Sequence, residues 1–407
     1  MLSGLDQKRR NYEKRSGKLL QIKDLYSLSK KLKVKNKKVV FTIGTFDLIN
    51  PGHCRYLAEA KACGDILVVG VSTDQSVKAL KGSDYPLVNQ DIRAEMVSFL
   101  KTVDYVIFVD EIAPHAILLL LKPDIFFTSN WDWNAGLRTK TDKDIVKNFG
   151  GKIVVMNVDK LGYSTNTLVD HIANIRVTQI MNRYFQERGK DLNIDVSGIF
   201  KPAEYGSQQP FYKNGFNSNK LILKSEEVRK MVPKSKGRKL VLVSGSYDLL
   251  HVGHARFVEQ AGLLGDVLVV AVPSDKSLRQ LKGVGRPVIS ERSRAYILGH
   301  LDPVDYVVIF DDTTVYSTLE TIEPDVFFTV DESWNKGYKQ SREYKLVKSY
   351  GGSVALAERQ APYLSASILI DKLAQKKVKE IFKECMDEER YIKITEEKSR
   401  INGANGK

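Results

Sequence analysis

The chain has 407 residues, of which 43% are hydrophobic and 28% are charged, so it has enough apolar side chains to bury two domain-sized cores. No apolar run approaches the roughly 18 residues of a membrane-spanning helix, and the first ten residues lack the apolar stretch of a signal peptide. Three cysteines without metal-ligand spacing indicate reduced thiols rather than disulfides or a zinc site. These features predict a cytoplasmic protein without a membrane span.

The formal net charge of +14 is concentrated near the start of the chain. Residues 1–38 contain thirteen Lys or Arg and three Asp or Glu, which gives this segment a charge of +10 (13 − 3). Leucines at helical spacing, from Leu19 to Leu32, predict a basic N-terminal helix whose apolar face docks on the first domain. A surface for RNA or for anionic membranes is the alternative. A similar segment at 220–232 favours docking, and without a basic stripe interleaved with aromatic residues, nucleic-acid binding is not expected.

Residues 39–170 recur at 240–371 with no insertion or deletion. Residue n aligns with residue n+201, and 44 of the 132 aligned positions are identical. A repeat of this length is a whole domain rather than a solenoid unit. The sequence therefore predicts nucleotide-binding-type domains at 39–175 and 220–372, a linker rich in Gly, Pro and polar residues at 176–219, and a charged helix and tail at 373–407.

In chain order, each copy alternates short apolar runs with helical patterns. In the first copy we expect strands at residues 38–43, 66–71, 105–109, 125–128 and 153–158. Helices are expected between them, at residues 54–61, 90–100, 113–121 and 142–149. Strands joined by helical crossovers are parallel, so the predicted fold class is α/β, with two tandem Rossmann-like, doubly wound parallel-sheet domains. A binding site is then expected at the carboxyl ends of the strands.

The turn from the first strand into the first helix carries the residues with the clearest chemistry. In the second copy it contains His251, Gly253 and His254, preceded by a stretch that we also assign to nucleotide binding, Gly245, Ser246, Tyr247 and Asp248. Main-chain N–H groups at a helix N-terminus attract anions, a glycine lets a phosphate approach the backbone, and two histidines three residues apart face the same side. The pattern predicts a triphosphate site. The counterparts in the first copy are Gly44, Thr45, Phe46, Asp47, Asn50, Gly52 and His53.

The alternative for these histidines is structural: one caps the helix and the other packs in the core. It is disfavoured because three of the six histidines in the chain lie in this one motif.

A family resemblance follows from these motifs. The pattern Gly-x-x-Asp-x-x-His-x-Gly-His, the pair Lys282-Gly283, Arg294 at the start of a helix and a late Ser-Thr together resemble the signature of the cytidylyltransferase-like nucleotidyltransferases. Within this family, the chain is most similar to the heptose-1-phosphate adenylyltransferase and glycerol-3-phosphate cytidylyltransferase groups. Its tandem layout looks like that of ethanolamine-phosphate cytidylyltransferase.

The resemblance implies one reaction, in which the phosphate of a sugar or polyol phosphate attacks the α-phosphorus of an NTP and pyrophosphate leaves. It implies that His251 and His254 donate hydrogen bonds to the phosphates and that Lys282 and Arg294 hold them, with His53, Lys81 and Arg93 as counterparts. It also implies that Mg²⁺ bridges the triphosphate oxygens without a dedicated protein metal site. Hydroxyls for the phosphates would come from Ser164, Thr165 and Ser365.

The copies depart from this pattern in different ways. The first has Asn50 in place of the first histidine and Tyr85 in place of Arg286, whereas the second has both residues but lacks the Thr of the late Ser-Thr. We therefore expect the second copy to be the stronger site. Activity of both copies on different acceptors is the alternative.

The predictions of the acceptor and of the nucleotide base depend on fewer residues. Asp331 and Trp334, which follow a later strand, and Arg286, which follows the Lys-Gly pair, are weak candidates for contacting the acceptor. The cytidylyltransferases are expected to have Arg-Thr-x-Gly before the late Ser-Thr, and neither copy has an arginine at the matching place, although Arg359 is one residue away. This difference predicts ATP rather than CTP.

Other functions stay open. The first alternative is a CTP-dependent glycerol-3-phosphate or ethanolamine-phosphate cytidylyltransferase, and one of another class is a nucleotide-binding pseudoenzyme that serves as a scaffold. The expected partners are an NTP and a phosphorylated sugar or polyol. Pairing of the two domains with each other and formation of a homo-oligomer are both compatible with the sequence.

Overall fold

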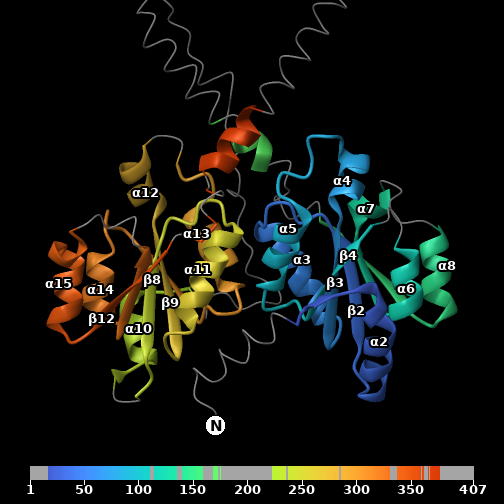
Figure 1. The fold of residues 1–407 in the computed structure, drawn as a ribbon, viewed down its shortest axis with the longest axis horizontal. Helices are drawn as coiled ribbons and strands as arrows, with labels where there is room; N and C mark the ends of the chain where they lie inside the picture. Colours follow the sequence, from blue (N-terminus) through green and yellow to red (C-terminus); the bar gives the residue numbers. More distant parts are fainter. Residues whose placement is uncertain are drawn as a thin grey trace, which may run out of the picture. The chain divides into compact units, whose positions relative to one another are not determined.

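The computed structural model of the protein describes the greater part of both repeats (Figure 1). The described residues are 17–110, 114–134, 140–158, 168–172, 175, 222–234, 237–283, 286–330, 337–358, 360–361, 365 and 367–375. Two compact units are present: the first combines residues 1–165 with 206–366 and contains both sheets, and the second combines 166–205 with 367–407. The linker and the tail expected from the sequence lie almost entirely outside the described residues.

Each repeat forms one six-stranded sheet in which all pairings are parallel. The first sheet contains, in spatial order, β1 (Leu19–Leu20), β4 (Tyr105–Val109), β3 (Ile66–Ser72), β2 (Val39–Gly44), β5 (Ile125–Ser129) and β6 (Lys152–Met156). The second contains, in the reverse direction, β7 (Ile222–Leu223), β10 (Tyr306–Phe310), β9 (Val267–Pro273), β8 (Leu240–Ser244), β11 (Val326–Val330) and β12 (Ser353–Ala357). The predicted pair of doubly wound parallel domains is confirmed.

Helices cover both faces of each sheet (Figure 1). Those of the first repeat are α2 (Leu25–Val34), α3 (Pro51–Ala62), α4 (Asp74–Lys81), α5 (Gln90–Ser98), α6 (His115–Leu121), α7 (Asn130–Asn134) and α8 (Lys140–Asn148). Those of the second are α10 (Ser225–Met231), α11 (Val252–Gly262), α12 (Asp275–Lys282), α13 (Glu291–Gly299), α14 (Tyr316–Ile322) and α15 (Arg342–Ser349), and short 3-10 turns lie at Ile22–Asp24 and Tyr338–Gln340. The sequence did not predict α4 and α12, which end at the Lys-Gly pairs.

The strand order determines where a ligand binds. The chain moves outward in one direction from β2 through β3 to β4, and then returns to the other side of β2 with β5. The same reversal lies between β8 and β11 in the second repeat. In doubly wound sheets, ligands bind at the carboxyl ends of the strands where the order reverses. The turns that follow β2 and β8 begin at these points.

Several aspartates that are identical in both copies hold the sheets together instead of taking part in chemistry. The carboxylates of Asp124 and Asp325 each accept a main-chain N–H at the start of the central strand, from Val39 and Leu240, at 2.7 Å in both cases. Because an unpaired buried N–H is costly, these carboxylates stabilise the first residue of β2 and β8. Their recurrence in the two repeats therefore has a structural cause.

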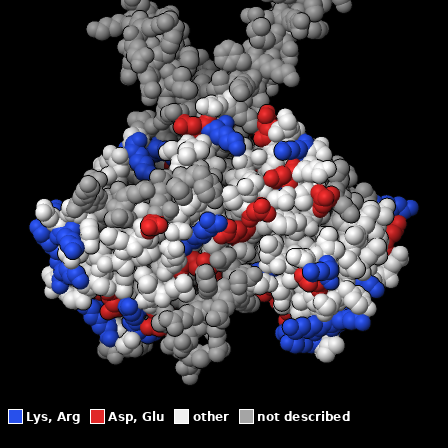
Figure 2. Space-filling view, viewed as in Figure 1, with Lys and Arg blue, Asp and Glu red and all other residues white. Residues whose placement is uncertain are grey.

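The basic N-terminal segment has a strand as well as the expected helix. Leu19 and Leu20 form the edge strand β1, so the helix begins only at Leu25. Leu28 and Leu32 are buried against α6 and neighbouring strands, and the α2 lysines lie on the exposed side (Figure 2). This arrangement agrees with a docking role.

Deletion of residues 1–38 is expected to destabilise the first repeat. The deletion removes β1 and uncovers the apolar surface beneath α2, where each buried leucine contributes about 1.5–3 kcal/mol. We expect Tm to fall by on the order of 10 °C, with negligible affinity for RNA or anionic vesicles before and after truncation. Salt-sensitive binding by the full chain that disappears on truncation would contradict the docking role.

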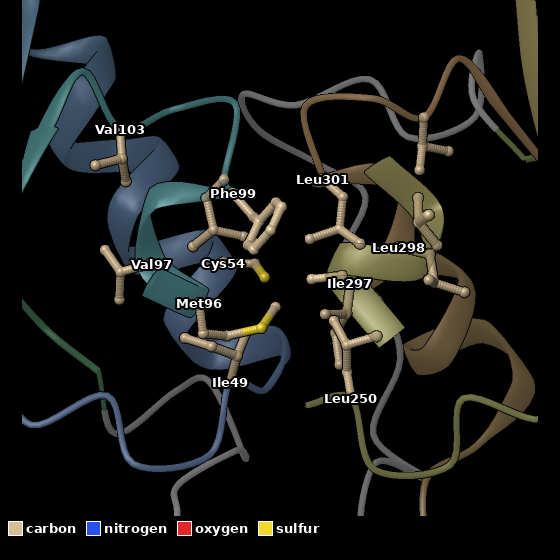
Figure 3. Close-up of a cluster of buried hydrophobic side chains, with 14 of the residues drawn as sticks. Ile49, Cys54, Met96, Val97, Phe99, Val103, Leu250, Ile297, Leu298 and Leu301 are labelled. Carbon is tan, nitrogen blue, oxygen red and sulfur yellow. The ribbon is translucent and has the colours of Figure 1, made fainter. Parts of the chain in front are cut away.

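The two repeats pack against each other within the first unit. Their inner helices α3, α5, α11 and α13 contribute to one shared cluster of buried apolar side chains (Figure 3). Leu100 and its counterpart Leu301 form an antiparallel bridge, flanked by hydrogen bonds from the Lys101 N–H to the His300 carbonyl and from the Asp302 N–H to the Phe99 carbonyl. Equivalent residues thus contact one another across a local pseudo-two-fold axis.

Candidate active site

The turn after β8 has a fixed conformation that depends on a glycine and a tyrosine. Tyr247 adopts a left-handed backbone conformation (φ 47°), and its buried ring lies across Gly245, where a Cβ atom would be 2.9 Å from it. Phe46 and Gly44 repeat this arrangement in the first copy. The glycine that ends each first strand is therefore required by the aromatic ring that follows it.

The two histidines of the second copy lie together at the start of α11. His251 is the residue before the helix, and its ring stacks on that of His254 with centroids 3.8 Å apart. The Tyr247 ring contacts His254 edge-on at 5.2 Å between centroids. The structure thus brings together the pair that the sequence singled out, at the sheet edge where a ligand is expected.

Gly253 is required here for a reason that the sequence did not reveal. A Cβ atom at this position would lie 2.4 Å from the carbonyl oxygen of Gln360 and 3.1 Å from the ring of His251. The main chain at Gln360 therefore lies directly against the first turn of α11. Whether a phosphate also approaches Gly253 stays a prediction.

Lys282 extends to the same turn from the last residue of α12. Its Nζ donates a hydrogen bond to the Ser246 hydroxyl at 2.9 Å. Partial burial lowers the pKa of Lys282, and the positive charge of Arg286 lowers it further. Gly283 ends the helix with φ at 83°, a conformation that favours glycine. Lys282 thus places a positive charge at the turn, and Gly283 ends the helix directly after it.

Asp248 joins the turn to the segment that carries Arg286. One carboxylate oxygen accepts the N–H groups of Val288 and Ile289, at 2.6 and 3.0 Å, and the other accepts from Arg286 Nη1 at 2.7 Å. The side chain of Asp248 is fully buried. Arg286, a weak candidate for acceptor contact, is therefore held beside the turn.

Arg294 and Arg93 lie inside the protein, each 1% exposed. The Arg294 guanidinium donates to the carbonyls of Ser246, Pro273 and Ile289, and it forms an ion pair with Asp275 at 2.8 Å. Arg93 makes the same set of bonds in the first copy, to Thr45, Ser72, Val88 and Asp74. These contacts hold the Thr45 and Ser246 turns in place, and a direct contact to phosphate stays a prediction.

The first copy has Asn50 in place of a second imidazole, and the Asn50 side chain has a structural function. This fully buried side chain caps α3, since its Oδ1 accepts the His53 N–H at 3.1 Å. Burial, reinforced by the charge of Lys81, lowers the pKa of His53 to about 4, so its ring is neutral at pH 7. The Lys81 Nζ lies 6.0 Å from the centre of the Tyr85 ring, and Tyr85 is the counterpart of Arg286 in the second copy. The second copy thus has one histidine and one cation more.

Several predicted residues are not available for comparison with this geometry. Ser164, Thr165, Asp331 and Trp334 lie outside the described residues. Ser365 is described and partly buried. Within the described ranges, no group of three or more His, Cys, Asp or Glu side chains is placed to hold a metal ion. No helix in the same ranges is long and apolar enough to cross a membrane.

Sequence reasoning missed two contacts that determine the site. One is the Gln360 carbonyl at Gly253, and the other is the set of bonds between Arg294 and Asp275. The second left a signal, because Asp275 and Arg294 recur together as Asp74 and Arg93. The first left none, since a main-chain oxygen has no identity in the sequence.

Both repeats match the family model described as cytidylyltransferase-like, over residues 41–187 and 242–388. The chain belongs to the cytidylyltransferase-like family. This membership indicates an enzyme of the nucleotidyltransferase type and confirms the resemblance drawn from the His, Lys and Arg motifs.

Curated relatives are similar to part of the chain. "Bifunctional protein HldE" of Geotalea uraniireducens is 45% identical over 125 residues, which are 30% of this chain and 24% of the relative. The protein of the same name from Aliarcobacter butzleri is 40% identical over 141 residues, 33% of this chain and 30% of the relative. The chain therefore spans about a quarter to a third of the length of these relatives.

A solved structure, "Crystal structure of the lipopolysaccharide core biosynthesis protein from Thermoplasma volcanium GSS1", shares 23% identity over 30% of this chain and 98% of that one. Its TM-score of 0.26 is too low to support a structural comparison.

Proposed function

We propose that the second repeat is the main active centre of an enzyme that joins an NTP, preferably ATP, to the phosphate of a sugar or polyol. The observation that carries this proposal is the stacked pair His251 and His254 after the carboxyl end of β8, on the turn whose Ser246 hydroxyl accepts a hydrogen bond from Lys282. Several side chains with N–H donors at one turn suit a polyphosphate. Family membership supports the same class of reaction.

The proposed reaction is a single in-line displacement. An oxygen of the acceptor phosphate forms a bond to the α-phosphorus of the NTP. The bond from that phosphorus to the oxygen bridging to the β-phosphate breaks, and pyrophosphate leaves with the electron pair. No protein atom forms a covalent bond. Catalysis then depends on positioning and on donors placed where negative charge develops.

The residues of the turn have separate roles in this reaction. The rings of His251 and His254 donate N–H groups to the α- and β-phosphates, and the Lys282 ammonium compensates the growing charge. Arg294 keeps the Ser246 carbonyl in place, and Gly253 allows α11 to start close to the Gln360 segment. The charged groups are thereby fixed before the nucleotide binds, which avoids reorganisation during the reaction.

We also propose that Mg²⁺ arrives with the nucleotide. The oxygens of Asp248, the carboxylate of this turn, accept two main-chain N–H groups and Arg286, and the described residues form no cluster suited to a metal. Mg²⁺ often keeps several waters and binds mainly through substrate phosphates. The ion would neutralise part of the triphosphate charge, and no protein side chain is assigned to it.

The base preference rests on the segment before the late Ser-Thr. Gln360, a residue of this segment, lies against the start of α11 and therefore beside the proposed phosphate site. It contains no arginine at the position expected in a cytidylyltransferase, and Arg359 is its neighbour. Without an arginine at that position to donate to the acceptor groups of cytosine, the segment favours ATP.

ATP is expected to bind more tightly than CTP and to turn over faster. Titration of each NTP with Mg²⁺ by calorimetry measures binding, and pyrophosphate release with a panel of sugar and polyol phosphates measures turnover. The Arg359→Ala variant serves as the control for reading by that neighbouring side chain. Tighter binding and faster turnover with CTP would identify a cytidylyltransferase instead. Tight NTP binding without pyrophosphate release with any acceptor would indicate a nucleotide-binding scaffold.

A further inference from the structure

An ion pair connects the first repeat to the helix that carries the histidines of the second. Arg256 of α11 donates from Nε and Nη2 to the two carboxylate oxygens of Glu95 in α5, at 2.8 and 2.6 Å. Both side chains are partly buried, with 34% and 24% of their surfaces exposed. A two-point contact between an arginine and a carboxylate fixes orientation as well as distance.

The position of Arg256 links this pair to the proposed phosphate site. Arg256 follows His254 by two residues, so the ion pair holds the turn of α11 directly beyond the stacked rings. Ala255 and Val258 of the same helix are buried in the cluster shared by the two repeats. Apolar packing fixes the distance between the repeats, and the ion pair adds a directional contact that resists rotation of α11 about its own axis.

We propose that Glu95 of the first repeat is a positioning residue for the active site of the second. It acts through Arg256 to set the orientation of α11 and therefore of His251 and His254. This inference rests on the proposed function for its effect on turnover, and on the described contacts alone for its effect on the histidine rings. A small displacement of donors aimed at a reacting phosphate is costly, so the pair affects catalysis more than its contribution to stability suggests.

The support acts in one direction only. The counterpart of Glu95 in the second repeat is Tyr296, which has no carboxylate to offer. The counterpart of Arg256 is Arg55, and its guanidinium lies 4.0 Å from Glu59 of its own helix. The first repeat thus orients the helix of the second, whereas the described part of the second repeat shows no equivalent ion pair to the helix that carries His53.

This asymmetry gives a function to the repeat with the incomplete site. In the first repeat a capping asparagine takes the place of the first histidine, yet this repeat supplies the acidic partner for α11 of the complete site. Loss of the pair is expected to affect the stronger site specifically.

The experiment compares three variants of the full-length protein with a matched control. Glu95→Gln and Arg256→Gln each remove the ion pair, and the double variant Glu95→Arg with Arg256→Glu restores it in reverse. Arg55→Gln is the control, because it removes the equivalent arginine of the first repeat. Ring resonances of His251, His254 and His53 are measured by NMR without nucleotide, and kcat and KM are measured by pyrophosphate release.

Each single variant is expected to shift the His251 and His254 resonances and to lower kcat by about 10-fold, with little change in KM for the nucleotide. The His53 resonance is expected to stay in place, and the charge-reversed double variant is expected to recover most of the loss. Arg55→Gln is expected to leave His251, His254 and kcat unchanged.

Two results would overturn the proposal. One is a lower Tm in the single variants with unchanged His251 and His254 resonances, which would assign the pair to stability alone. The other is an equal effect of Arg55→Gln on those resonances. Failure of the proposed function is a separate result: the wild-type protein would then release no pyrophosphate with any acceptor, and the NMR comparison would still test the positioning of α11.

Discussion

Replacement of His254 with alanine is expected to lower kcat by about 10²–10³, the usual cost of losing one preorganised hydrogen-bond donor to developing charge. His254 is stacked against His251 at 3.8 Å, and the Tyr247 ring contacts it edge-on at 5.2 Å, so its direction is fixed before the substrate binds. The turn itself depends on Gly245, Gly253 and the buried Arg294. Thermal unfolding is therefore expected to change little, and pyrophosphate release measures the loss.

The matched variant in the first repeat is His53→Ala. Burial keeps the His53 ring neutral at pH 7. No second imidazole lies beside it, since the position that matches His251 is Asn50, which caps the helix. We expect this variant to retain most of the turnover of the wild-type protein. If activity survived His254→Ala and disappeared in His53→Ala, the first repeat would be the main active centre.

The central strands of the fold were predictable because the same sequence pattern occurs in both repeats. Strands β2 to β5 differ from their predicted ranges by no more than one residue at either end, and the gap-free alignment of residues n and n+201 transfers them to the second repeat. The edge strands β1 and β7 were not predicted, since two residues are too few to show an alternating pattern. Their pairing depends on the main chain of β4 and β10.

The histidine pair was predictable from local spacing alone. Residues three apart at the start of a helix lie on one side, and the stacked rings of His251 and His254 agree with this. The interior position of Arg294 was not predictable in the same way. Its acceptors are the carbonyls of Ser246, Pro273 and Ile289, which come from three separate segments and have no side-chain identity.

The contact between Glu95 and Arg256 illustrates the same limit. Each residue reads as an ordinary surface charge on its own helix, and the two are 161 positions apart. The pairing becomes visible only when the two repeats are seen to associate through Leu100 and Leu301. The contacts between the repeats could therefore be identified only in the structure, whereas the chemistry of the residues within one turn was predictable from the sequence.

Replacement of Asp248 with alanine is expected to destabilise the second repeat by about 3–5 kcal/mol, the usual result when one partner of a buried ion pair is removed. The substitution leaves Arg286, of whose side chain only 16% is exposed, without its carboxylate. It also leaves the N–H groups of Val288 and Ile289 without their acceptor. Because these bonds join the turn after β8 to the segment before α13, turnover is expected to fall as well. Urea unfolding measures the loss of stability.

Asp47→Ala in the first repeat is the matched control, and a smaller loss of about 1–3 kcal/mol is expected there. Asp47 accepts the N–H groups of Leu87 and Val88, at 2.8 and 2.9 Å, but Tyr85 takes the place of the arginine. Burial raises the pKa of Asp47, and the N–H groups of Leu87 and Val88 oppose this rise. Equal losses in the two variants would mean that the main-chain bonds account for the whole effect and that Arg286 contributes nothing to the stability of the turn.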